Sequence, residues 1–185
     1  VEASNGIVHL IDEVLIPPTI ELPKDNIFEI AESVPTLTTL VSVLNKFPDL
    51  VNALSSDGTY TVFAPDNDAF AALLVDIGQT SIDDVPESVL RKVLEYHVIS
   101  VAAVMSGDLS DGQTADALSG EQLTVAINGD DVLISGSKVT MPDVEASNGV
   151  VHIMENVMVP PSIVPIVGTI VAPAYFNKDF TLLIS

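Results

Sequence analysis

The chain has 185 residues, 48% of them apolar, so it can build one ordinary domain with a sizeable core and short extensions. Only 6 lysines and arginines stand against 26 acidic side chains, and the net charge of −20 argues against partners with phosphate backbones or anionic lipid head groups. The chain has no cysteine, which excludes disulfides, thiolate metal sites and cysteine nucleophiles.

The first predicted elements are helices. Residues 25–34 and 36–47 are expected to form two helices that break at Pro35, and apolar residues recur every three or four positions along the second. A third, short helix is expected over Asp49–Leu54.

A strand and two more helices are predicted next. The segment Thr59–Ala64 is rich in β-formers and predicts a strand. Asp66 is placed to cap a helix over residues 67–75. Pro86 opens another helix, whose apolar face ends at His97.

The second half of the chain is β-like. The segments Leu123–Ile127 and Val132–Ile134 flank Asn128-Gly129, a strong signal for a hairpin. Further strands are expected over Val139–Met141 and Val150–Val159. Helices that come before strands, rather than alternating with them, predict an α+β fold.

The longest apolar stretch, Val157–Ala174, is interrupted by four prolines. Proline removes backbone donors and kinks helices, so this stretch predicts a linker and not a membrane span. We therefore expect no membrane insertion in this segment.

One segment of the sequence occurs twice. Residues 1–20 and 144–163 are identical at 12 of 20 aligned positions, and the offset of 143 residues continues without a gap to the end of the chain. A period of that length is a whole domain. We expect residues 24–163 to be one complete domain, residues 1–20 to be the C-terminal strands of a preceding repeat, and residues 166–185 to begin a following one.

Three segments, in this order, resemble the signatures of the fasciclin domain family. Thr61–Phe70 looks like the first signature, Leu94–Ile99 resembles the central Tyr-His motif, and Ala146–Pro161 resembles the second signature. The resemblance covers about residues 24–163.

This resemblance implies a fasciclin-like β-wedge or sandwich with several helices packed around it. It also implies an extracellular, cell-surface protein that acts in adhesion, and the lack of cysteines and of Asn-x-Ser/Thr sequons favours a bacterial one. The adhesion candidates by resemblance are Tyr96, His97, Asp143, Val144 and Asn148. Asp143-Val144 is similar to an Asp-Ile pair linked to integrin binding in animal members, but without an Arg-Gly-Asp sequence we do not carry integrin recognition over.

The residues that could carry other chemistry also have structural interpretations. His97 and His152, which is equivalent to His9 in the repeat, are expected to be buried core histidines, with a metal or catalytic role as the alternative. The stretch from Ser135 to Lys138 matches the Ser-x-x-Lys pattern of acyl-serine enzymes, but it falls in a hairpin and no second element follows. We therefore expect no enzyme, no metal and no cofactor.

Two functions from different classes stay open. The first is an adhesion and structural module of a tandem-repeat surface protein or filament, in contact with neighbouring repeats head-to-tail and with an unknown surface protein or polysaccharide. The second is binding of an apolar ligand such as a carotenoid or lipid, although the chain has no tryptophan.

Overall fold

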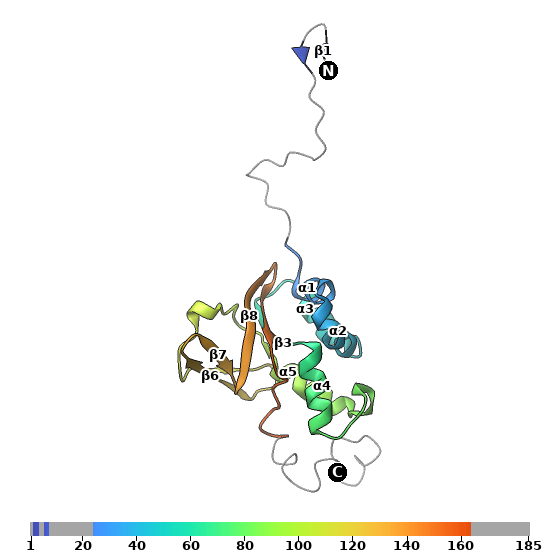
Figure 1. Cartoon of the computed structure of the whole chain (residues 1–185), viewed down its shortest axis with the longest axis vertical. Helices are drawn as coiled ribbons and strands as arrows, with labels where there is room; N and C mark the ends of the chain where they lie inside the picture. The colour runs from blue at the N-terminus through green and yellow to red at the C-terminus, as the bar shows by residue number, and fades with distance from the viewer. Residues whose placement is uncertain (1, 4–5, 8–23, 164–185) are drawn as a thin grey trace.

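The computed structural model describes residues 2–3, 6–7 and 24–163 of the chain. Residues 24–163 contain helices and one seven-stranded sheet (Figure 1). The expected start of a following repeat, residues 166–185, and most of residues 1–20 lie outside the described residues.

The helices begin and end close to their predicted limits. Pro35 separates the first two, as predicted, and the Asp66 carboxylate accepts a hydrogen bond from the backbone N–H of Ala69 at 2.8 Å, so it caps the fourth as predicted. The helices are α1 (Ile27–Ser33), α2 (Thr38–Leu44), α3 (Pro48–Ser55), α4 (Asn67–Asp76) and α5 (Glu87–Tyr96), with 3-10 turns η1 (Pro35–Leu37), η2 (Ile82–Asp84) and η3 (Ser106–Asp108).

The seven strands form one sheet in the order β4-β3-β9-β8-β7-β6-β5. Neighbouring strands are antiparallel, except that β3 and β9 run parallel. This arrangement confirms the α+β class. The strands are β3 (Tyr60–Pro65), β4 (Val98–Ile99), β5 (Thr114–Asp116), β6 (Gln122–Asn128), β7 (Asp131–Ile134), β8 (Ser137–Ala146) and β9 (Gly149–Met154).

Three strand predictions were wrong in their limits. The hairpin loop is Gly129-Asp130, one residue later than predicted, because Asn128 still pairs with Asp131. Strand β9 ends at Met154, where the chain bends, and not at Val159. Strand β8 is ten residues long instead of three, since it continues through irregular pairing that breaks the alternation of polar and apolar side chains.

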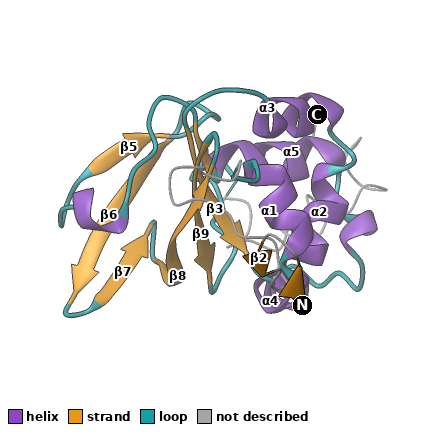
Figure 2. Ribbon diagram, turned by 90° about the horizontal axis from the view of Figure 1, so that it is seen from above, coloured by secondary structure: helices purple, strands orange, loops and turns teal. Residues whose placement is uncertain are grey.

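The sheet divides the apolar residues into two clusters. Strands β3 and β9 are buried on both faces, with Val62, Val151 and Ile153 in the cluster on the helix side. Phe63 and Met154 belong to the other cluster, inside the wedge that β5–β8 form. Figure 2 shows the helices α1–α5 gathered on one side of β3 and β9 and the strands β5–β7 on the other.

The segment after β9 belongs to this core. Ile163 is fully buried in the helix-side cluster, and its N–H donates to the Pro160 carbonyl at 2.9 Å. At the other end, the Asp25 carbonyl accepts from the N–H of Ser147, in the turn between β8 and β9, at 2.9 Å. The described domain therefore starts and finishes at opposite ends (Figure 1).

Among the described residues, no single helix is long and apolar enough to cross a membrane. The pair Ile27–Ser33 and Pro35–Leu44 passes by length and composition, but it is bent by 101°. Its apolar side chains, among them Ile27, Leu37 and Val43, are buried in the core.

A second, two-stranded sheet consists of β1 (Glu2–Ala3) and β2 (Gly6–Ile7). Its strands are antiparallel, with Glu2 opposite Ile7 and Ala3 opposite Gly6.

Candidate functional site

The structure divides the five adhesion candidates into two groups. Tyr96, His97 and Asn148 are buried, with exposed fractions of 2%, 2% and 4%. Asp143 and Val144 are half-buried and lie next to each other on β8. Only the second pair can meet a partner without unfolding of the domain.

Tyr96 and His97, at the end of α5, form hydrogen bonds to β6 and to the segment after β9. The Tyr96 hydroxyl donates to the Gln122 carbonyl at 3.0 Å. The Nδ1–H of His97 donates to the Val93 carbonyl at 2.7 Å, and its Nε2 accepts from the N–H of Met158 at 2.9 Å. Burial lowers the pKa of His97 to about 4, so the ring is neutral at pH 7. Both residues hold the fold together and do not form a contact surface.

Asn148 joins three parts of the chain. Its Oδ1 accepts from the N–H of Ile27, the first residue of α1, at 2.9 Å. Its Nδ2 donates to the carbonyls of Leu54 and Ser56, at the end of α3, at 2.8 and 2.9 Å. Each polar atom of the amide is therefore used, and the turn between β8 and β9 is fixed against two helices.

Asp143 stands on a bulged part of β8. The pairing of β8 with β9 shifts between Met141 and Val144, and Asp143 has φ = 60°. Its carboxylate accepts hydrogen bonds from the N–H and the hydroxyl of Ser106. Burial pushes the pKa of the Asp143 carboxyl up, but these hydrogen bonds outweigh it and the pKa lies below its usual value. The bulge therefore carries a negative charge and is held in place.

His152, on the neighbouring strand β9, forms a hydrogen bond to the backbone of this bulge. Its Nδ1 accepts from the backbone N–H of Asp143 at 3.2 Å, and its Nε2–H donates to the Val104 carbonyl at 2.9 Å. The ring stacks on Phe63 with centroids 5.5 Å apart. Burial lowers the pKa of His152, so the neutral form persists at pH 7. In the described part of the chain, no three His, Cys, Asp or Glu side chains come together as a metal site.

The exposed residues beside Asp143 complete the surface. Met141 is 54% exposed and Pro142 is also exposed. Strand β7 pairs with β8 only through Lys138 and Ser137, so it does not cover the later part of β8. We call Met141–Val144 the contact strip. Sequence reasoning had found Asp143 and Val144 by resemblance but had not singled out Met141.

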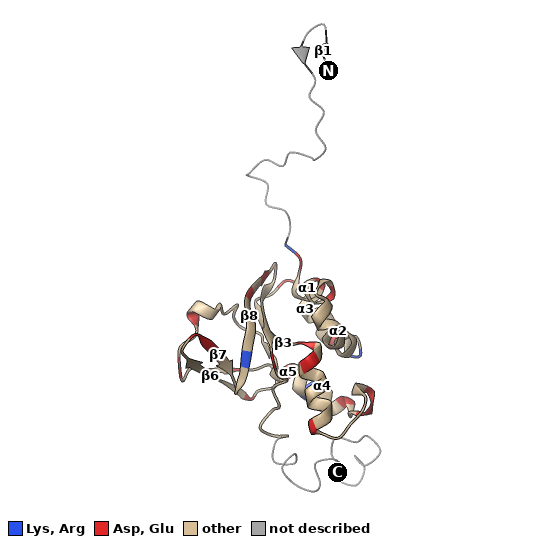
Figure 3. Cartoon of the chain, viewed as in Figure 1, with Lys and Arg blue, Asp and Glu red and all other residues tan. Residues whose placement is uncertain are grey.

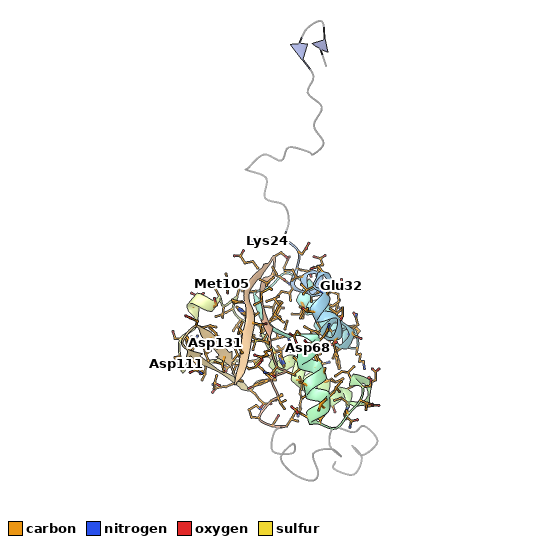
Figure 4. The ribbon with its side chains drawn as sticks, in the orientation of Figure 1. Lys24, Glu32, Asp68, Met105, Asp111 and Asp131 are labelled. Carbon is orange, nitrogen blue, oxygen red and sulfur yellow. The ribbon has the colours of Figure 1, made fainter. Side chains whose placement is uncertain are left out.

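An open groove lies beside the turn between β8 and β9, with a volume of about 330 Å³. Thr59, Met105, Glu145 and Gly149 are among the residues that line it. Glu145 forms an ion pair with Lys24, so the groove is at the end where the described domain begins, as the positions of Lys24 and Met105 in Figure 4 show. We call it the turn groove.

The apolar pockets are much smaller. The pocket inside the wedge, lined by Phe63, Leu123, His152 and neighbouring apolar residues, has about 20 Å³ of free space, and the one beneath α3 has the same. That volume holds roughly one water-sized group. Neither of these two pockets, as it stands, has room for a carotenoid.

Acidic residues are spread along the helices, strands and loops of the described domain (Figure 3). The few cations there are largely neutralised: Lys24, Lys46, Arg91 and Lys138 each pair with a carboxylate. The described surface is therefore mainly negative, and these four residues do not form a basic patch.

The comparisons with known proteins agree with one another. The family described as Fasciclin domain matches residues 35–160. "Protein sll1483" from Synechocystis is 40% identical over 139 residues, which cover 73% of each chain. "Transforming growth factor-beta-induced protein ig-h3" from Sus scrofa is 33% identical over 86% of this chain, and human "Periostin" is 28% identical over 86%. The chain spans only 22% and 18% of the length of those two proteins.

Among solved structures, the chain is similar to a FAS1 domain pair from the insect cell adhesion molecule Fasciclin I. The TM-score is 0.63 and the identity is 22%, over 88% of this chain and 58% of the other. This likeness supports the fold.

Proposed function

We propose that this chain, which belongs to the fasciclin domain family, is an adhesion-type module whose contact strip meets the partner. The observation that carries the proposal is the bulge on β8, where only Pro142 separates the exposed Met141 from the charged Asp143. Hydrogen bonds from Ser106 and to His152 hold the bulge, so little conformational freedom would be lost on binding.

The module belongs, in this proposal, to a tandem array on an extracellular surface. Residues 24–163 are one complete repeat, between the C-terminal strands of a preceding repeat (1–20) and the start of a following one (166–185). The 143-residue period and the opposite positions of the two domain ends favour a head-to-tail order. The turn groove is the surface that a preceding repeat would contact, and a surface protein or polysaccharide is the outside partner.

A catalytic role has little support from the polar residues near the contact strip. Ser106 and His152 both contact Asp143, but the two ring nitrogens of His152 face the Asp143 N–H and the Val104 carbonyl. Neither nitrogen is placed to take the proton of the Ser106 hydroxyl, which donates to the Asp143 carboxylate. We therefore infer an adhesion role and no enzyme.

The experiment measures retention of beads coated with this chain on surfaces coated with collagen, with a neutral polysaccharide or with the chain itself. We expect retention on at least one surface, and we expect Met141→Asp to abolish it without lowering the melting temperature. Val101→Asp is the matched control, because Val101 is 82% exposed and outside the contact strip. Retention that both variants reduce equally, or no retention on any surface, would show that the contact strip is not the adhesive surface.

A further inference from the structure

The described domain, residues 24–163, contains the dipeptide Asn-Gly twice. Asn128-Gly129 lies at the turn between β6 and β7, and Asn148-Gly149 lies at the turn between β8 and β9. In this dipeptide the asparagine amide and the next backbone nitrogen can react with each other, because glycine has no side chain that shields its nitrogen. Whether they react depends on how the fold holds the amide, and the two turns differ in this respect.

The turn between β6 and β7 leaves its asparagine free. Asn128 pairs through its backbone with Asp131, and Asn128, Gly129 and Asp130 are all exposed. Within residues 24–163 nothing forms a hydrogen bond with the Asn128 side chain or with the Gly129 N–H. A Cβ added to Gly129 would meet no atom within 4 Å beyond its chain neighbours, so the space around the loop is open. Figure 2 shows this turn at the outer edge of the wedge, away from the helices.

Asn148 is also followed by glycine, but its surroundings are the opposite. It is 4% exposed, and both polar atoms of its amide are held by the three hydrogen bonds to the start of α1 and the end of α3. A Cβ on Gly149 would lie 2.0 Å from the Tyr60 carbonyl oxygen, so the backbone of β3 closes the space beside this turn. The amide has to leave all three partners before it can reach the Gly149 nitrogen.

We propose that Asn128 is a site of spontaneous self-modification, at which the backbone nitrogen of Gly129 attacks the side-chain amide carbon of Asn128. A new C–N bond forms, the bond from that carbon to the amide nitrogen breaks, and this nitrogen leaves as ammonia with the proton of the Gly129 N–H. The product is a cyclic succinimide. Water then opens the ring at either of its carbonyls and leaves aspartate or isoaspartate at position 128. The inference rests on the two turns and not on the adhesion proposal.

The modification changes both the charge and the length of the hairpin. Each product carries a new carboxylate beside the exposed Asp130 and near Asp131, whose own carboxylate pairs with Lys138 at 2.7 Å. Isoaspartate also carries its side-chain carbon in the main chain, so the backbone before Gly129 becomes longer by one atom. A two-residue loop fixes the register of its strands, and this lengthening opposes the pairing of position 128 with Asp131. The tip of the hairpin therefore changes as the protein ages.

The hydrogen bonds of Asn148 give the expected difference in rate. Three bonds of ordinary net strength must open before its amide can react, and each slows the reaction about five-fold. Together they make conversion of Asn148 about a hundred-fold slower than conversion of Asn128 in the folded domain.

The test incubates the folded wild-type chain at mildly alkaline pH and follows both positions over time. Trypsin separates them, because cleavage at lysine places Asn128 in residues 93–138 and Asn148 in residues 139–178. Tandem mass spectrometry measures the fraction of each amide that has become an acid, and chromatography separates aspartate from isoaspartate. We expect conversion at position 128 to be about a hundred-fold faster than at position 148, with both products present. In the Asn128→Gln variant, whose amide is one carbon further away, residues 93–138 should gain no acid at position 128.

The same chain in concentrated urea is the control for the effect of the fold. The hydrogen bonds of Asn148 are absent there, so both positions should convert at similar rates. Equal rates in the folded protein would overturn the proposal, and so would conversion at position 128 that occurs only in urea. A rate difference that is as large in urea as in the folded protein would also overturn it, because flanking residues and not the two turns would then decide which amide reacts.

Discussion

Replacement of Asn148 by alanine should loosen three parts of the domain at once. The substitution removes one acceptor and two donors, and it leaves the N–H of Ile27 and the carbonyls of Leu54 and Ser56 without their partner. The site is closed to solvent, since Asn148 is 4% exposed. The start of α1 and the end of α3 would then no longer be tied to the turn between β8 and β9.

The magnitude follows from the number of groups left unpaired. A buried donor or acceptor without a partner costs about 1–3 kcal/mol, and three such groups with some relaxation give about 3–5 kcal/mol. Domain stabilities are roughly 5–15 kcal/mol, so this is a large fraction of the total. For a domain of this size the melting temperature should fall by about 10–20 °C.

Asn5→Ala is the control, because Asn5 is the same residue in the same local sequence. Thermal and urea unfolding of both variants, at low micromolar concentration so that copies stay separate, should show a large loss for Asn148→Ala and almost none for Asn5→Ala. Equal losses would refute the argument, because they would mean that the amide contributes through local turn formation and not through its contacts with α1 and α3.

Three further predictions concern the pH dependence of stability, the room for a side chain at position 149 and the effect of salt. Because the pKa of His97 is about 4 in the fold and 6.5 when unperturbed, the unfolded state binds more protons between these values. The contribution of neutral His97 to the free energy of unfolding is therefore fully present above pH 6.5, and it falls by about 3 kcal/mol as the pH is lowered to 4. Urea unfolding of His97→Gln across this range should show a shallower slope than wild type, and an unchanged slope would contradict the assignment. Gly149→Ala should cost about 3 kcal/mol, because its Cβ would meet the Tyr60 carbonyl, whereas Gly6→Ala should be nearly neutral in a thermal melt. Added NaCl should raise the melting temperature, because the net charge of −20 repels itself and physiological salt screens beyond about 8 Å; a falling value would argue against self-repulsion.

Sequence reasoning succeeded where one local rule determines the structure. Pro35 ended α1 and Asp66 capped α4, because each residue acts on the backbone beside it. It failed for β8, where Pro142 and Asp143 interrupt the alternation of side chains. The pairing of that strand depends on β9 and on contacts with η3, which no local pattern contains.

The candidate site was predictable only in part, for the same reason. Resemblance picked out Asp143 and Asn148, but their different roles depend on partners far away in the sequence, Ser106 for one and Ile27 for the other. Asparagine followed by glycine predicts an exposed turn, and the turn is present, but its amide points into the protein. Met141 belongs to no pattern in the sequence that marks it as exposed. It is exposed because β7 pairs with β8 only as far as Lys138.

The parallel pairing of β3 with β9 has a consequence for how the protein is made. Tyr60 and Gly149 are about 90 residues apart in sequence, so on the ribosome β3 is synthesised well before its partner and closing that loop is a slow, late step. In the proposed tandem array, the homologous strand of the preceding repeat would already be complete at that moment. That earlier strand must already be paired within its own sheet, because otherwise it could pair with β3 of the next repeat. The order of synthesis therefore favours correct pairing from the N-terminal repeat onward.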